Sequence, residues 1–297
     1  MPVEIRSLLR AAHERLAAAG VPDPEIDAEL IVAHHLDVSR GRVQALAVMG
    51  ERLGDEQAHA VSEMVAQRAE RVPLQHLTGR APFRSMQLRV GPGVFVPRPE
   101  TEGVVQFAID ALEASPLPEP VAVDLGTGSG AIALAMATEV PRARVFAVEK
   151  SPEARVWTEQ NIAEQRAENL TLLAGELQEL LPGGAGPVTE ALAPYAGKLQ
   201  VLISNPPYVP DAAVPRDPEV RLHDPKLALY GGADGLDIIR DISRIGLSFV
   251  APGGLLVLEH GELQGAAIRE LLTADGWRAA ATHPDLTTRD RTTTAIR

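Results

Sequence analysis

The feature that most constrains the fold of this 297-residue chain is an alternation of strands and helices that begins at Val121. Four apolar runs, VAVDLG, ARVFAVE, LTLLAG and KLQVLISN, predict strands, and the segments 131–140 and 152–168 predict helices between them. Such alternation gives a mainly parallel sheet with helices on both faces. Ligands of these sheets bind at the carboxyl ends of the strands, so the residues after each strand are the functional candidates.

The first seventy residues predict a small bundle of four helices instead. Apolar residues at helical spacing end at Gly20, and Asp23-Pro24, Ser39 and Asp55 stand where three further helices are expected to begin. These helices carry no recognisable catalytic motif. We expect residues 1–78 to form a helical domain that docks the substrate.

The segment FRSMQLRVGPGVFV, residues 83–96, alternates apolar and polar residues around Gly91-Pro92-Gly93. This pattern predicts a β-hairpin with its turn at the glycines. We expect residues 79–99 to be a hairpin connector and residues 100–297 to form the α/β domain, which would begin with a helix from about Glu100.

Composition excludes several classes of function. Hydrophobic residues make up 45% of the chain and charged residues 23%, as in ordinary soluble globular proteins. The absence of cysteine excludes disulfides, thiolate metal sites and cysteine nucleophiles. His34 and His35 are adjacent on a predicted helix and have no third ligand nearby, so no metal site is expected. Neither a signal peptide nor a membrane span is visible, and we expect a cytoplasmic protein.

The net charge of −12 argues against a broad electrostatic interaction with nucleic acid or a direct nucleic-acid substrate. Residues 71–99 are an exception, since they contain five arginines and no acidic residue. This segment is either an ordinary solvated surface or a docking patch for an anionic partner.

The first predicted strand of the α/β domain runs into a glycine-rich turn. Gly126, Gly128 and Gly130 allow close approach of a ligand to the backbone between this strand and the following helix. The spacing differs from the pyrophosphate-binding G-x-G-x-x-G, and Asp124 just before it suits a cationic group such as an aminoacyl ammonium. The alternative is a turn with no ligand.

Carboxylates follow the next two strands. Glu149 is placed to accept hydrogen bonds from both hydroxyls of a ribose, although a solvent-facing helix cap is the alternative. Glu176 follows the third strand and is either an adenine contact, with Leu177 packed on the ring, or an ordinary surface glutamate.

The fourth strand ends in Asn205-Pro206-Pro207-Tyr208. Asn205 offers both an amide oxygen and an NH2 group, and the two prolines hold the backbone carbonyls in fixed directions. Two fixed acceptors can orient a substrate NH2 group toward an electrophile, and Tyr208 offers a flat face for a planar group or a positive sulfur centre. A rigid structural turn is the alternative.

The sequence leaves two interpretations open for each of several other polar residues. Glu259, at the end of a buried strand, is equally suited to the floor of the site and to a structural hydrogen bond. Arg98, Glu100 and Thr101 lie where the connector meets the α/β domain, and they either brace the entrance of the site or make interdomain pairs.

DLGTGSG (124–130), VEKS (148–151) and NPPY (205–208) together resemble class I S-adenosylmethionine-dependent methyltransferases that modify planar amino groups. Such a resemblance implies a Rossmann-like domain with a mostly parallel seven-stranded sheet. NPPY alone is only moderately specific, because adenine and cytosine amino-methyltransferases use similar motifs.

Four more segments narrow the resemblance: QHLTG (75–79), FVPRPETE (95–102), DPKLALYGGADGLDIIR (224–240) and LLVLEHGELQG (255–265). They are similar to the HemK/PrmC family, the peptide chain release factor glutamine methyltransferases. The resemblance covers the chain from the helical domain to the C-terminus. It implies S-adenosylmethionine as methyl donor and the glutamine of the release factor Gly-Gly-Gln loop as acceptor, a role in translation termination.

The resemblance also assigns roles to individual residues. The cofactor would contact Asp124, Gly126, Thr127, Gly128, Ser129, Gly130, Glu149, Glu176, Leu177 and Asn205. Asn205 and the Pro206 carbonyl would hold the glutamine amide, and Pro207 and Tyr208 would line the substrate site. Asn205, Pro206 and Tyr208 are the expected catalytic residues. Glu149 and Glu176 both stand where the family commonly has Asp.

Two other classes of function remain open from the sequence. The first is a nucleic-acid amino-methyltransferase that uses NPPY on a flipped base, against which the acidic net charge counts. The second is a non-catalytic cofactor-binding module, for which an altered NPPY motif would be expected. The intact motif favours an enzyme.

Overall fold

The computed structural model describes residues 2–297, which form two compact units. Unit 1 comprises the residues up to Arg80 together with Pro215–His223, and unit 2 comprises Ala81–Val214 and Asp224–Arg297. A short segment that follows the NPPY motif in the sequence therefore clusters with the N-terminal helices. The predicted domain bounds remain a prediction.

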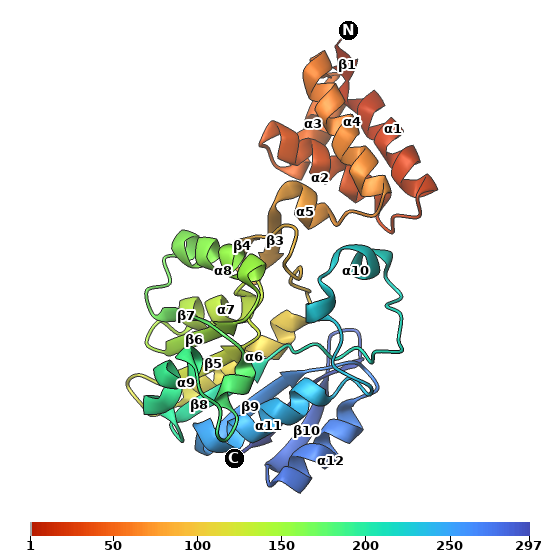
Figure 1. Cartoon of the computed structure of the whole chain (residues 1–297). Coiled ribbons are helices and arrows are strands. Elements are labelled where there is room, and N and C mark those ends of the chain that lie inside the picture. The colour runs from red at the N-terminus through yellow and green to blue at the C-terminus, as the bar shows by residue number, and fades with distance from the viewer. Residues whose placement is uncertain (1) are drawn as a thin grey trace. The chain divides into compact units, whose positions relative to one another are not determined.

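Unit 1 is a helical bundle with one two-stranded sheet (Figure 1). Its elements are β1 (Val3–Glu4), α1 (Ile5–Ala18), α2 (Pro24–Leu36), α3 (Arg40–Met49), β2 (Arg52–Leu53), α4 (Asp55–Ala69), α5 (Leu74–Thr78) and α10 (Pro218–His223). Leu16, Ile31 and Val61 are fully buried in its core. Apolar faces of α1, α2 and α4 thus pack on one another, as the helical spacing of their apolar residues predicts.

The structure agrees only in part with the residues predicted to begin the helices of unit 1. Ser39 caps α3, since its Oγ accepts a hydrogen bond from the Arg42 N–H at 3.2 Å. Asp23 precedes α2 without a side-chain capping bond. Asp55 is the first residue of α4 and not its cap, because Gly54 takes the extended cap conformation.

Unit 2 contains a seven-stranded sheet in the order β10-β11-β9-β8-β5-β6-β7. The strands are β5 (Val121–Leu125), β6 (Arg144–Glu149), β7 (Leu170–Ala174), β8 (Leu199–Ser204), β9 (Val250–Glu259), β10 (Arg278–Pro284) and β11 (Asp290–Ile296). Strands β5 to β9 are parallel, and β11 is antiparallel to both of its neighbours. The predicted Rossmann-like α/β fold is confirmed.

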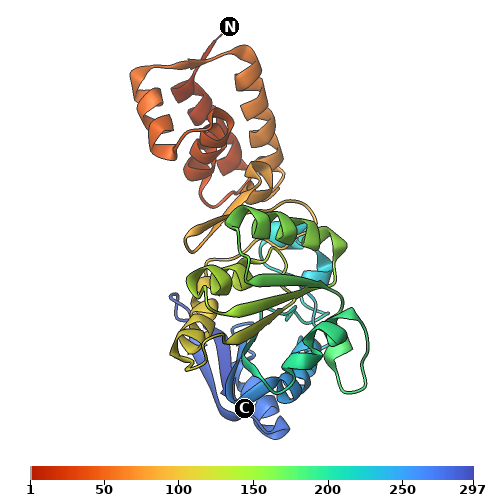
Figure 2. The same ribbon diagram turned by 90° about the vertical axis from the view of Figure 1, so that its left-hand side faces the viewer.

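Helices cover both faces of this sheet, as the views in Figures 1 and 2 show. One core contains residues of α6 (Thr101–Ala114), α7 (Ala131–Glu139) and α8 (Pro152–Gln165). The other contains residues of α9 (Pro187–Leu192), α11 (Asp237–Phe249) and α12 (Gly265–Asp275). Ala122 of β5 faces the first core and Val123 the second, so the central strands are apolar at nearly every position.

The carboxyl ends of β5 to β9 define one edge of the sheet, which we call the carboxyl edge. The strand order reverses at β5, which pairs with β6 on one side and β8 on the other. Such a reversal opens a crevice outside the strand ends where ligands of α/β sheets bind. The candidate site therefore lies at this edge.

The hairpin exists, but its predicted turn is wrong. Its strands are β3 (Arg80–Phe83) and β4 (Met86–Arg89), so the turn is Arg84-Ser85 and not the glycines at 91–93. Arg84 takes a left-handed φ of 52°, and its N–H donates to Glu102 Oε1 at 2.9 Å. A tertiary contact stabilises this turn, which a pattern of local residues does not reveal.

The glycines at 91 and 93 allow the backbone to pack closely against a helix and do not form the hairpin turn. A Cβ atom on Gly91 would come within 2.4 Å of Trp157 Cζ2, and one on Gly93 within 2.9 Å of Glu153 Cβ. Both neighbours belong to α8. The segment after the hairpin therefore lies directly on this helix.

Within residues 2–297, no helix combines the length and the apolar character that crossing a bilayer requires. The cytoplasmic location remains a prediction.

Candidate functional site

The glycine-rich turn after β5 has two open glycines and one packed glycine. All three have positive φ, at 73° for Gly126, 58° for Gly128 and 85° for Gly130. A Cβ atom on Gly126 or Gly128 would meet nothing within 4 Å, whereas one on Gly130 would come within 3.0 Å of Thr158 Cγ2. The first two glycines therefore leave backbone open to a ligand, and the third allows α7 and α8 to pack closely.

Asp124 lies fully buried below this turn. Its Oδ2 accepts a hydrogen bond from Thr127 Oγ1 at 2.6 Å, and its Oδ1 has no hydrogen-bond partner among residues 2–297. Burial, opposed by the Thr127 hydroxyl and the Ala133 backbone N–H, raises the pKa of Asp124 to about 7. One buried acceptor is thus left for a donor group of a ligand on the turn.

Glu149 joins the end of β6 to the same turn. Its Oε2 accepts the Gly128 N–H at 2.9 Å, and its Oε1 accepts the Ser151 N–H at 2.8 Å. The side chain is buried, and each carboxylate oxygen retains a further lone pair for an external donor. Glu149 therefore holds the backbone at Gly128 in addition to its predicted contact with a ribose.

The end of β7 is less enclosed. Glu176 is exposed, and its backbone N–H donates to Glu179 Oε1 at 3.0 Å. Leu177 is half-buried against the second core. Exposure of Glu176 gives no independent support to the adenine contact, which remains a prediction.

The NPPY motif begins directly after Ser204, the last residue of β8. Asn205 is half-buried and Pro206 is buried. Among residues 2–297, neither a backbone nor a side-chain donor bonds to the Pro206 carbonyl. That carbonyl is available to a donor group of a ligand.

The segment GGADG, residues 231–235, supports the NPPY backbone. Gly231 approaches so closely that a Cβ atom there would lie 2.3 Å from the Pro207 carbonyl oxygen, and one on Gly235 would lie 2.2 Å from that of Tyr208. Val209 and Tyr230 form a parallel bridge beside these contacts. Only glycine permits this packing, so the two segments, distant in sequence, fix each other's backbone.

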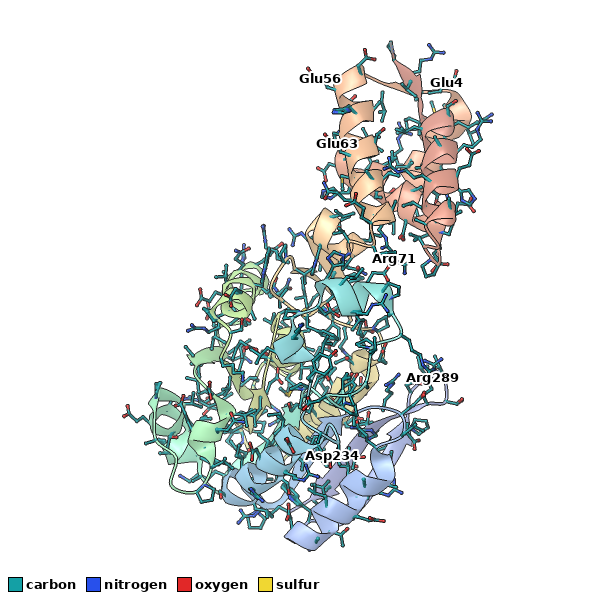
Figure 3. The ribbon with its side chains drawn as sticks, turned by 45° about the vertical axis from the view of Figure 1, so that its right-hand side comes forward. Glu4, Glu56, Glu63, Arg71, Asp234 and Arg289 are labelled. Atoms are coloured by element: carbon teal, nitrogen blue, oxygen red, sulfur yellow. The ribbon has the colours of Figure 1, made fainter. Side chains whose placement is uncertain are left out.

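Gln264 also supports the backbone of the NPPY motif, a role that the sequence alone did not predict. Its Nε2 donates to the Tyr208 carbonyl at 2.9 Å and, more weakly, to the Asp234 carbonyl at 3.3 Å, and its Oε1 accepts the Gly261 N–H at 2.8 Å. Asp234 is labelled in Figure 3. In the sequence, Gln264 is marked only by its place within the segment LLVLEHGELQG. The structure is needed to show what it contacts.

Charged groups of several elements converge on Tyr208 and Glu259. Burial is the main cause that raises the pKa of Tyr208, and Glu259 and Glu100 add to it while Arg291 and Arg98 oppose it. Glu259 is only 1% exposed, and burial raises its pKa to about 7. The structure thus brings Glu100, Arg98 and Glu259 to the same site as the NPPY motif.

The basic segment 71–99 is not a free positive surface. Arg89 Nε lies 2.6 Å from Glu164 Oε2, Arg98 Nη2 lies 2.8 Å from Asp224 Oδ2, and Arg84 pairs with Glu139. Arg71 pairs with Glu219 at 2.6 Å. These four charges are compensated by carboxylates distant in sequence, and a docking role of this segment remains a prediction.

Family models match two parts of the chain. Residues 7–79 match the model described as "PrmC N-terminal domain", and residues 118–184 match "Putative methyltransferase". The second match contains the glycine-rich turn, Glu149 and Glu176.

Full-length relatives are similar over nearly the whole chain. The release factor glutamine methyltransferase of Streptomyces coelicolor is 46% identical over 286 residues, which cover 96% of this chain and 95% of the relative. That of Bifidobacterium longum is 42% identical and covers 97% of each chain. Among solved structures, the hMettl16 catalytic domain gives a TM-score of 0.55 with 11% identity, and covers 83% of this chain and 84% of the other. This last likeness shows the fold alone.

Proposed function

Because the chain belongs to the release factor glutamine methyltransferase family, we propose that its carboxyl edge transfers a methyl group from S-adenosylmethionine to the side-chain amide nitrogen of a release factor glutamine. The acceptor would be the glutamine of the Gly-Gly-Gln loop. Such transfer makes an N-methylated glutamine and leaves the demethylated cofactor and one proton.

The residues at the carboxyl edge fit S-adenosylmethionine. Backbone at Gly126 and Gly128 is open to a ligand, and Glu149 retains acceptor capacity for ribose hydroxyls. Asp124 Oδ1 is a buried acceptor without a partner among residues 2–297, which suits a donor such as an ammonium group. When bound, the cofactor supplies an electrophilic methyl group on a positively charged sulfur.

The substrate end of the site consists of Asn205, Pro206, Pro207 and Tyr208. An amide nitrogen is a poor nucleophile because its lone pair is delocalised into the carbonyl group. Acceptance of its two N–H hydrogens by Asn205 Oδ1 and the Pro206 carbonyl would return electron density to the nitrogen and aim it at the methyl group. Each contact is worth about 1–3 kcal/mol.

The single observation that carries this proposal is the fixed, unbonded Pro206 carbonyl. Pro206 and Pro207 cannot rotate about φ, and the close approach of Gly231 and Gly235 holds the following carbonyls in place. The acceptor next to Asn205 is therefore pre-organised before substrate binds. This geometry suits catalysis by positioning, which needs no strong base.

Methyl transfer to a release factor tests the substrate. The measurement compares labelling of a release factor that has Gln at the third position of its Gly-Gly-Gln loop with one that has Ala there. We expect labelling of the first alone. Equal labelling of both, or labelling only of DNA or RNA, would contradict the proposal.

Asn205→Ala tests the role of the motif. The substitution removes one acceptor of the substrate amide, so we expect turnover to be nearly abolished while S-adenosylmethionine binding changes by only a few-fold. Calorimetry measures binding and the labelling assay measures turnover. Full activity together with normal binding would show that Asn205 does not hold the substrate.

A further inference from the structure

Glu259 ends β9 beside the strand that carries the NPPY motif. Ser204 of β8 pairs with Leu258 of β9 in a parallel register, so Asn205 and Glu259 leave the sheet side by side. Glu259 is 1% exposed, and its Oε2 has no hydrogen-bond partner among residues 2–297. A buried carboxyl oxygen without a partner requires an explanation.

Two uncharged side chains near this carboxyl group oppose the rise of its pKa that burial causes. They are the hydroxyl of Thr101, at the start of α6, and the amide of Asn205, and both favour the ionised form of Glu259. Thr101 is itself buried, and its Oγ1 has no geometrically ideal bond within the described chain. Of these two donors, Asn205 is the one that also belongs to the NPPY motif.

We propose that Glu259 is a positioning residue that orients the Asn205 amide by accepting a hydrogen bond from its Nδ2. The inference rests on the proposed role of Asn205 in holding the substrate glutamine. With Nδ2 directed at the carboxylate, Oδ1 is left to accept from the substrate NH2 group.

The need for such a residue follows from the chemistry of an amide. The oxygen and NH2 ends of an Asn side chain have nearly the same size, so packing alone does not decide which end faces the substrate. An ionised carboxylate only accepts hydrogen bonds, and it therefore selects the NH2 end. A protonated Glu259 can donate to Oδ1 instead, and the reversed amide would present an NH2 group to the substrate NH2.

This orientation makes turnover dependent on the ionisation of Glu259. Burial and the nearby Glu100 raise its pKa to about 7, while Thr101, Arg291 and Asn205 favour the carboxylate. Thr101 is the first residue of α6 and Glu100 directly precedes it, and Arg291 belongs to β11, which pairs with β9. Tyr208 is the other titratable group that interacts with Glu259, and its raised pKa keeps it neutral throughout. We expect kcat to rise with pH through about 7 and then to level off.

Glu259→Gln tests the inference, with Glu262→Gln as the matched control. Gln keeps the size of the side chain but can offer either end to Asn205. We expect kcat on a release factor to fall about 10- to 100-fold, which corresponds to a lost or reversed hydrogen bond. The KM for the release factor and the Kd for S-adenosylmethionine should stay within about three-fold. Glu262 has a half-exposed side chain and lies 3.8 Å from Arg289, so its variant should keep wild-type kinetics.

Two further measurements separate positioning from a structural role. The rise of kcat through about pH 7 should be present in wild type and Glu262→Gln and absent in Glu259→Gln. The double variant Asn205→Ala/Glu259→Gln should be no slower than Asn205→Ala alone, because Glu259 acts through Asn205. Additive losses, or an unchanged pH profile in Glu259→Gln, would overturn the inference. Failure of wild type to label a release factor would instead contradict the proposed function.

Discussion

Glu219 and Glu259 are both buried glutamates, but their surroundings differ in one respect. Glu219, in α10 of unit 1, accepts hydrogen bonds from Arg68 at 2.7 Å and Arg71 at 2.6 Å. The donors next to Glu259, at the end of β9 in unit 2, are the uncharged Thr101 and Asn205, and Arg291 acts on it only through its charge. Figure 3 labels Arg71, which lies beside α10.

The contrast appears in the direction of the two pKa shifts. Burial opposes ionisation of Glu219, but interactions with Asp217, Arg71 and Arg68 outweigh it and lower its pKa to about 2. Burial dominates at Glu259 and raises its pKa to about 7. Two guanidinium groups compensate a buried carboxylate, and neutral donors do not. The uncompensated glutamate is the one beside the NPPY motif, as perturbed groups at functional sites commonly are.

The largest expected effect comes from breaking the compensated site. Glu219→Ala leaves the guanidinium of Arg71 without its carboxylate, while Arg68 keeps Asp27 at 2.6 Å. We expect a loss of about 3 kcal/mol in the free energy of unfolding of unit 1, because removing one partner of a buried ion pair leaves an uncompensated charge. Urea unfolding followed by far-UV circular dichroism measures it.

Two spectroscopic signals distinguish the unfolding of the two units in this experiment. Both tryptophans, Trp157 and Trp277, belong to unit 2, so their fluorescence follows unit 2 while circular dichroism follows the helices of both. Glu63→Ala is the control, since the Glu63 side chain is 63% exposed and its partner is His59. A Glu219→Ala variant as stable as Glu63→Ala would show that the ion pairs contribute nothing.

The second expected effect has the opposite sign and lies in unit 2. Glu259→Gln removes a carboxyl whose pKa rises from 4.5 to about 7 on folding. The native state binds a proton that the unfolded state has released, so the stability contributed by this group is complete below pH 4.5 and is lost as pH rises through about 7. We therefore expect the variant to gain about 1–3 kcal/mol over wild type at pH 8 and almost nothing at pH 4.5.

Tryptophan fluorescence during urea unfolding at a series of pH values measures this difference. Asp124 has a similarly raised pKa, but it is present in both proteins and cancels in the comparison. A difference independent of pH would mean that Glu259 does not hold its proton in the folded state. A gain in stability together with lost turnover would identify Glu259 as a residue kept for function at a cost in stability.

The sequence predicted those parts of the fold that depend on local patterns. The strand-helix alternation after Val121 and the Ser39 cap needed only neighbouring residues. The turn at Arg84-Ser85 was missed because a contact with Glu102 stabilises it. The ion pairs of the basic segment were also missed, because the sequence shows charge along the chain and not the carboxylates, such as Glu164, that folding brings to it.

In the candidate site, too, the residues that depend on local patterns were predicted and the contacts between distant segments were not. Asn205 and Glu149 were predicted because they follow strands, and parallel strands end at one edge. The support of the NPPY backbone by Gly231 and Gln264 depends on contacts between segments more than twenty residues apart, which no spacing reveals. The pairing of Glu219 with Arg68 and Arg71 was equally hidden, since about 150 residues separate the partners.

The smallest expected effect concerns the guanidinium group of Arg71, which bonds to Glu219. Arg71 donates to Gly20 O and Glu219 Oε2, each at 2.6 Å, through different nitrogens of one guanidinium. Arg71→Lys keeps the charge but has a single donor centre, so it loses one of the two contacts. We expect a cost of about 1 kcal/mol in the stability of unit 1, measured by circular dichroism as above. Arg10→Lys, at an exposed position of α1, is the control and should cost nothing measurable. If Arg71→Lys were as damaging as Glu219→Ala, the geometry of the guanidinium, and not its charge alone, would be what keeps Glu219 ionised.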